Sequence, residues 1–315
     1  KAKISSRFPA GEIFSILWNR RGCFPAAEFL LRIPCCDWGP PVQSSLIRRA
    51  KIWTLLSGLY SLPAFKSHFY ESHYNVPCKE EDQIRKDVIR TFTPKYSAEE
   101  KEAKMESFRN SVTQILRALV HHIPEVGYVQ GMNFIAAGLL FSLRGTESIR
   151  PVDEKTCFLL FVSILKTYGL EKIYLNNMTH ILELTRHFED YIKKTEPEIS
   201  QKLEMSDSSV FVFFTSVLFS LCTHVLPLEL SPRIFDLFFT FGLDGLMNLL
   251  FCLIKANRSK FLSVLDPEEL MTMIRDSIMP GLMLVNGGLD YLMKELSSFM
   301  RDEQIVCFAL KDRSH

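Results

Sequence analysis

The chain has 315 residues, of which 47% are hydrophobic, so it is long enough to bury one large core or two. Its 37 Lys and Arg residues balance 36 Asp and Glu residues, which gives no support for a nucleic-acid-binding protein. The eight cysteines include no C-x-x-C pair, and no His pair has zinc-ligand spacing, so we expect reduced core cysteines, as in cytoplasmic proteins, and no metal site. Because the first residue is Lys1 rather than Met, we expect a fragment of a longer protein.

Helical patterns dominate the chain, and strand patterns are poor. Residues 1–38 are either an N-terminal extension or the first helices. Beyond them, apolar residues recur at helical spacing in 83–92, 108–119, 132–143, 154–169 and 181–199. We therefore predict an all-α protein with two helical lobes, at about 39–150 and 151–315, and a boundary in the polar segment 144–153.

The segment "QIRKDVIRTF", residues 83–92, is typical of a short helix whose apolar stripe contains Ile84 and Val88. At about 100° per residue, Arg90 points away from this stripe, and Asp87 lies beside it one turn earlier. Taken alone, the pattern favours Arg90 as a solvated charge with a surface ion pair to Asp87, which contributes almost nothing to stability. An arginine directed at a partner is the alternative.

The segment "VGYVQGMNFIAAGLLFSL", residues 126–143, is apolar on nearly all faces from Met132 onward, which predicts a buried helix. Gln130 and Asn133 lie at its start, three residues apart and therefore on one side of a helical turn. A buried amide without a partner costs about 1–3 kcal/mol. These two side chains must therefore either bond to neighbouring backbone or face a cleft, and the residues alone leave both open.

Two apolar segments, 210–230 and 234–254, resemble membrane spans. The first has an apolar core of about 13 residues, which is short of the roughly 20 that a span requires. The second contains Asp236 and Asp244, each of which is costly at the centre of a bilayer. Buried helices of a large α-helical domain have the same composition, so we expect core helices, with a multi-helix membrane protein as the alternative.

Other chemistries have weaker support. Neither a GxxxxGK[ST] nor a GxGxxG loop is present in the sequence, so we do not expect the chain to bind a nucleotide alone. His121 and His122 precede a loop and have no nucleophile motif, which favours a solvated or helix-end role. The acidic residues Glu80, Glu81 and Asp82 are predicted to lie in a solvated loop.

Three short motifs occur in a fixed order. They are "RAKIW" at 49–53, which follows "GPP" at 39–41, "IRKDVIR" at 84–90, and "GYVQGMN" at 127–133. Together they resemble the RxxxW, IxxDxxR and YxQ motifs of the TBC domain, the Rab GTPase-activating fold. The resemblance implies a TBC-like domain over residues 39–315, and we expect Trp53 of the first motif to lie in its core.

The resemblance covers roughly residues 39–300 and is weaker beyond Gly169. Phe214 and Phe235 stand where the family often has Trp, and both keep the apolar bulk of the position. The segment after Arg90 reads "TFTP" where the family often has "TFP". This additional residue lies near the chemistry and bears on the loop beside Arg90.

The resemblance implies that Arg90 is an arginine finger and that Gln130 positions the attacking water, both supplied in trans to a GTPase. Phosphoryl transfer needs positive charge where negative charge develops, and an amide can both accept from water and donate to phosphate. The same resemblance implies four supporting residues: Asp87, Tyr128, Arg49 and Asn133. We expect Asp87 to hold the helix or orient an arginine, Tyr128 to pack or to bond to the GTPase, and Arg49 to be structural.

By the same resemblance, the partner is a Rab-family small GTPase in its GTP-bound state, which supplies GTP and Mg²⁺. We expect no cofactor of the chain's own, no nucleic acid, a cytoplasmic location peripheral to endomembranes through the partner, and a role in vesicle trafficking. The alternative is a non-catalytic TBC module that binds a GTPase or a scaffold without stimulating hydrolysis. The residues leave open the particular Rab, the membrane and the oligomeric state.

Overall fold

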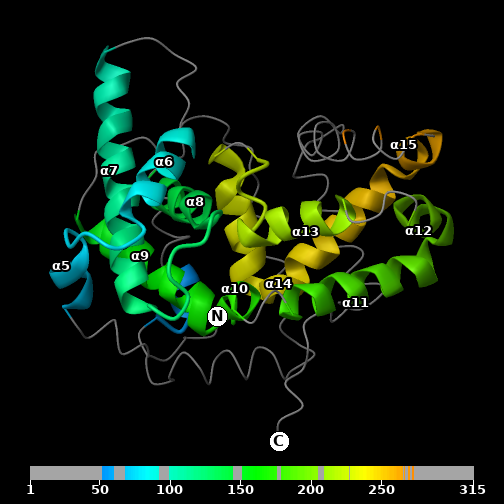
Figure 1. The fold of residues 1–315 in the computed structure, drawn as a ribbon, viewed down its shortest axis with the longest axis horizontal. Helices are drawn as coiled ribbons and strands as arrows, with labels where there is room; N and C mark the ends of the chain where they lie inside the picture. The colour runs from blue at the N-terminus through cyan, green and yellow to red at the C-terminus, as the bar shows by residue number, and fades with distance from the viewer. Residues whose placement is uncertain are drawn as a thin grey trace, which may run out of the picture. The chain divides into compact units, whose positions relative to one another are not determined.

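The computed structural model describes residues 52–59, 68–91, 99–144, 151–175, 179–204, 209–226, 228–264, 266, 269 and 272. All regular elements in these residues are helices, as the sequence predicts (Figure 1). Residues 1–38, Arg49 and Thr93 of the "TFTP" segment lie outside the described residues. The chain divides into two compact units, and the boundary between them follows Glu171.

The first unit is built around α7 and α8. Its described elements are a helical segment at 52–56, α5 (Phe69–His73), α6 (Glu81–Thr91), α7 (Glu99–His122), α8 (Met132–Arg144) and α9 (Pro151–Lys166). Helix α7 packs against α5, α6, α8 and α9, and α8 packs against α6 and α9. Because α9 packs on α7 and α8, the unit extends to Glu171, whereas the sequence placed the lobe boundary near residue 150.

The core of the first unit consists of apolar side chains at helical spacing. Ile115 and Leu119 of α7 and Ile135 of α8 have no exposed surface, as periodicity predicts. Trp53 is also completely buried, which confirms its predicted place in the core. Hydrogen bonds join distant segments around this core, including one of 2.7 Å from the Ser163 hydroxyl to the carbonyl of residue 57. The packed helices form a fixed base for α6 and for the loop between α7 and α8.

The second unit is also helical. It contains α10 (Glu171–Tyr174), which crosses the boundary, and then α11 (Thr179–Thr195), α12 (Pro197–Glu204), α13 (Ser209–Phe219), the 3₁₀ turn η3 (Leu228–Leu230), α14 (Ser231–Ala256) and α15 (Arg258–Ser263). Phe214 lies with its ring centroid 4.6 Å from that of Phe188, and Phe235 has no exposed surface. Both therefore occupy core positions that require aromatic or apolar bulk.

Within the described residues, α14 is the one helix long and apolar enough to cross a membrane by length and composition. However, 78% of its most apolar window is buried inside the protein, as in a core helix. Its backbone also leaves helical geometry at Gly242, where φ is 62°. The pieces on either side, 231–241 and 243–256, are each shorter than the roughly 20 residues of a span. Asp236 and Asp244, the two costly acids, are both buried within the unit.

Candidate functional site

Helix α6 presents two different faces, as its sequence predicts. Ile84 and Val88 are buried against the unit, with exposed fractions of 0% and 1%. The side chain of Arg90 is 72% exposed, whereas that of Asp87 is only 3% exposed. The sequence predicted a surface ion pair between Arg90 and Asp87, and this prediction is wrong for Asp87 because its side chain is buried. Asp87 is buried because the loop between α7 and α8 covers its side of the helix, and no local pattern in α6 reports that loop.

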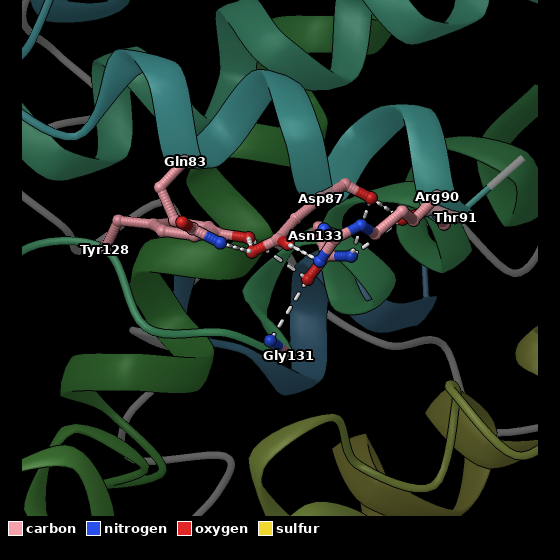
Figure 2. A network of polar contacts seen from close by, with 7 residues as sticks. All are labelled: Gln83, Asp87, Arg90, Thr91, Tyr128, Gly131 and Asn133. Atoms are coloured by element: carbon pink, nitrogen blue, oxygen red, sulfur yellow. Dashed lines mark hydrogen bonds and ion pairs between the residues drawn. The ribbon is translucent and has the colours of Figure 1, made fainter.

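The Asp87 carboxylate is the centre of a polar network with Gln83, Arg90, Thr91, Tyr128, Gly131 and Asn133, which we call the Asp87 network (Figure 2). Its Oδ2 atom accepts hydrogen bonds from Gln83 Nε2 at 2.9 Å and from the Tyr128 hydroxyl at 3.0 Å. Two donors compensate the loss of water around a buried carboxylate, whose desolvation would otherwise be costly. The expectation that Asp87 holds its helix in place is consistent with these bonds.

Arg90 is attracted to Asp87 without being fully engaged by it. The distance from Arg90 Nη1 to Asp87 Oδ1 is 3.7 Å, which is an ion pair but too long for a hydrogen bond. Among the described residues, the guanidinium makes no other ion pair or hydrogen bond, and because the side chain is 72% exposed, most of its five donors remain solvated. The carboxylate thus restrains one terminal nitrogen of the guanidinium and leaves the rest of its planar fork exposed.

Gln130 and Asn133 do not share one side of a turn, contrary to the sequence prediction. The helix begins at Met132, so Gln130 precedes it in a loop and its side chain is exposed. Asn133, in the first turn of α8, is 1% exposed. Gly131 separates the two with a φ of 114°, a conformation that favours glycine and turns the chain between them. Among the described residues, the Gln130 side chain has no hydrogen-bond partner.

The sequence left open whether Asn133 bonds to neighbouring backbone or faces a cleft. In the structure it bonds to neighbouring groups. Its Nδ2 donates to Thr91 Oγ1 at 2.7 Å and approaches the carbonyl of Asp87 at 3.4 Å. Its Oδ1 accepts the backbone N–H of Gly131 at 3.0 Å, and the Tyr128 hydroxyl lies 3.2 Å from the same atom. The amide therefore joins the last turn of α6 to the start of α8 (Figure 2).

The Tyr128 hydroxyl forms hydrogen bonds within the chain. The sequence left open whether Tyr128 packs or bonds to a GTPase. Its hydroxyl donates to Asp87 from the loop, 41 residues away in sequence. Gln83 and Thr91 were not predicted from the sequence as members of this network. The signal for both is local, because each lies four residues from Asp87 on the same helix and such residues are neighbours.

The acidic segment before α6 is not a solvated loop, so that prediction is wrong for Glu81. Glu81 begins α6, and Arg117 of α7 donates to both of its carboxylate oxygens, with an Nε–Oε2 distance of 2.7 Å. Arg85 donates to Oε1, also at 2.7 Å. These bonds to Arg117 and Arg85 lower the pKa of Glu81 to about 2, so the carboxylate is ionised at neutral pH. The pair fixes the N-terminal turn of α6 to α7.

The remaining candidate groups are the histidines at the end of α7 and three cysteines. His121 and His122 end α7, as predicted, and burial lowers the pKa of His122, whose ring packs against Phe69 and Phe158. Among the described residues, no group of three His, Cys, Asp or Glu side chains has the geometry for a metal ion. Cys157, Cys222 and Cys252 are buried cysteines, as the apolar sequence around them predicts.

Comparison with known protein families matches residues 48–262 to the Rab-GTPase-TBC domain. This match covers more than half of the chain, and the chain therefore belongs to the Rab-GTPase-TBC domain family. The family resemblance drawn from "RAKIW", "IRKDVIR" and "GYVQGMN" is confirmed.

Relatives and solved structures agree with this family. GTPase-activating protein GYP5 of Saccharomyces cerevisiae is 28% identical over 230 residues, which are 73% of this chain and 23% of the relative. Rab GTPase-activating protein tbc-11 of Caenorhabditis elegans is 26% identical over 237 residues, which are 73% of this chain and 24% of the relative. The chain thus spans about a quarter of the length of these relatives. The crystal structure of the Chlamydomonas flagellar RabGAP TBC domain has the same fold, with a TM-score of 0.66 at 20% identity over 91% of both chains.

Proposed function

We propose that this chain stimulates GTP hydrolysis by a Rab-family GTPase in its GTP-bound state, with Arg90 as the arginine finger and Gln130 as the residue that positions the attacking water. The observation that carries this proposal is the contrast between an exposed cation and the buried acid beside it, at 72% and 3% exposure. Such a pair offers charge to a partner while its anchor stays in the protein. The similarity to tbc-11, which is named a Rab GTPase-activating protein, supports a Rab as the partner.

The two side chains suit the chemistry of phosphoryl transfer. Arg90 would place a planar fork of donors against the phosphate oxygens, where negative charge develops. Gln130 would accept a hydrogen bond from the attacking water and donate one to phosphate. An arginine finger accelerates GTP hydrolysis by roughly 10³–10⁵, equivalent to about 4–7 kcal/mol of barrier. GTP and Mg²⁺ belong to the partner in this proposal, and the chain would meet endomembranes peripherally through that partner.

The test is single-turnover hydrolysis of GTP by a panel of purified Rab proteins, with and without this chain. We expect at least one Rab to be stimulated, and Arg90→Ala and Gln130→Ala each to remove most of the stimulation. Arg90→Lys should also be weak, because an ammonium group lacks the planar fork. Arg85→Ala is the matched control, since Arg85 is a 61% exposed arginine on the same helix.

The outcomes separate the two functions of a TBC module. Stimulation of no Rab in the panel would reject the enzymatic proposal, and binding without stimulation would establish a non-catalytic module. Full activity of Arg90→Ala would reject the assignment of the finger. A loss in Arg85→Ala equal to that in Arg90→Ala would mean that general surface charge, rather than a specific guanidinium, carries the effect.

A further inference from the structure

The Asp87 network joins the two segments that carry the exposed side chains of the proposed function. Arg90 lies in the last turn of α6, between Asp87 and Thr91. Gln130 lies in the loop before α8 and is followed directly by Gly131. Asn133 bonds to both segments, to Thr91 Oγ1 at 2.7 Å on one side and to the N–H of Gly131 at 3.0 Å on the other (Figure 2). Neither exposed side chain forms a hydrogen bond with this amide.

The direction of each bond fixes the orientation of the Asn133 amide. Thr91 Oγ1 donates its own proton to the carbonyl of Asp87 at 2.7 Å, so towards Asn133 it can act as an acceptor. The N–H of Gly131 can only donate. An amide turned by 180° would set its NH₂ group against the Gly131 donor and its oxygen against a hydroxyl whose proton is already used. In the orientation of the structure, the NH₂ group and oxygen of Asn133, the Thr91 hydroxyl and the Gly131 N–H all have hydrogen-bond partners.

The bridge acts on backbone positions rather than on the reacting side chains. Gly131 has a φ of 114°, which needs surrounding contacts to hold it in one conformation. Asn133 Oδ1 supplies such a contact one residue from Gln130. At its other end, Nδ2 holds Thr91, which is one residue from Arg90, in a partly buried contact in which Asn133 itself is 1% exposed. A shift at either end is transmitted to the other through one planar group.

We propose that Asn133 is a positioning residue that sets the spacing between the two catalytic segments, so that Arg90 and Gln130 reach one phosphate group together. This inference rests on the proposed function for its catalytic consequence, but its structural content concerns the free protein. Breaking the bridge at Thr91 should loosen the backbone at Gly131, although these two residues do not touch. The catalytic loss should fall on kcat, because the bridging amide is 1% exposed and would not itself bind the partner.

The structural test is amide hydrogen exchange at Gly131 in the free protein. Gln130–Gly131 is the single Gln-Gly pair in the sequence, so combined ¹³C-carbonyl glutamine and ¹⁵N-glycine labelling isolates its signal. We expect Thr91→Val to accelerate exchange by about fivefold, the effect of one lost hydrogen bond. Thr91→Ser retains the hydroxyl and should exchange like the unaltered chain.

Thr113→Val is the matched control. Thr113 Oγ1 donates to the carbonyl of Arg109 four residues earlier at 2.9 Å, which is the same local bond that Thr91 makes to Asp87. It lies in α7 and is not part of the Asp87 network. Unchanged Gly131 exchange in Thr91→Val, or equal acceleration in Thr113→Val, would overturn the proposal.

The kinetic test measures stimulated hydrolysis on a responsive Rab. Thr91→Val should lower kcat between about tenfold and a hundredfold with little change in KM, because misplacement of catalytic groups by a small distance has effects of this size. Thr91→Ser should restore kcat. If Gly131 exchange responds but the unaltered chain stimulates no Rab, the proposed function fails and the bridge stands. An active chain whose Thr91→Val variant keeps both kcat and Gly131 exchange would retain the function and refute the bridge.

Discussion

The ion pair between Glu81 and Arg117 should make a measurable part of the stability depend on pH. Both side chains are largely buried, at 17% and 13% exposure, and Arg117 engages both oxygens of Glu81. The folded protein lowers the pKa of Glu81 from 4.5 to about 2. At about 1.36 kcal/mol for each pKa unit, this depression corresponds to roughly 3 kcal/mol.

The sign of the effect follows from which state binds the proton more tightly. The unfolded chain takes up a proton on Glu81 near pH 4.5, whereas the folded chain does so only near pH 2. The stabilisation is therefore complete above pH 4.5 and is lost as the pH falls towards 2. Glu81→Gln removes the charge at every pH. We expect this variant to be less stable by up to about 3 kcal/mol at pH 7, and the difference to shrink steadily below pH 4.5.

The assay is urea unfolding followed by far-UV circular dichroism at pH 7, 4.5 and 3, with the same series for the unaltered chain and both variants. Glu106→Gln is the control, because Glu106 is 60% exposed and lies 3.5 Å from Arg109. An ion pair whose carboxylate is largely solvated, as that of Glu106 is, contributes about 0–1 kcal/mol. A Glu81→Gln penalty that stays constant from pH 7 to pH 3, or one no larger than that of Glu106→Gln, would refute the reasoning.

Two further predictions concern the core and the arginine anchor. Trp53→Ala should lower the free energy of unfolding by about 3–5 kcal/mol, since Trp53 has no exposed surface. Leu55→Ala, at a position 50% exposed, should cost far less. Equal costs for the two variants would contradict the packing around Trp53. Asp87→Asn keeps an oxygen for Gln83 and Tyr128, so it should cost only about 1 kcal/mol of stability in urea unfolding. It removes the charge that faces Arg90, so stimulated kcat should fall while KM stays constant, and an unchanged kcat would show that the charge does not position Arg90.

Much of this site follows from the sequence because helical periodicity is local. The spacing of Ile84 and Val88 is enough to place α6 and to turn Arg90 outward, and the apolar run of α8 is enough to bury that helix. The burial of Trp53 was expected from the family resemblance, through its place in the first motif. These features depend on residues within one or two turns of each other.

The remainder depends on contacts between segments far apart in sequence. Asp87 meets Tyr128 and Asn133 at separations of 41 and 46 residues, and Glu81 meets Arg117 at 36. A helical wheel ranks Asp87 with the solvated residues because it cannot include a loop from another part of the chain. The family resemblance singled out Asp87 as a supporting residue, but it predicted neither the burial of its side chain nor its partners.

The two proposed catalytic side chains are restrained in different ways, and this difference affects the free-energy cost of binding a partner. Arg90 is restrained by an ion pair at 3.7 Å, and Gln130 only through the backbone of its neighbour Gly131. Immobilising a flexible side chain at an interface costs roughly 0.5–1.5 kcal/mol. Restraining the backbone in advance removes the larger part of the ordering cost, because backbone ordering costs about 1–2 kcal/mol per residue. The partner then has to order only two side chains, and their final alignment depends on phosphate and water that the free chain does not contain. An arrangement of this kind favours selectivity for the nucleotide state, since a GTPase without its γ-phosphate offers Arg90 and Gln130 no common target.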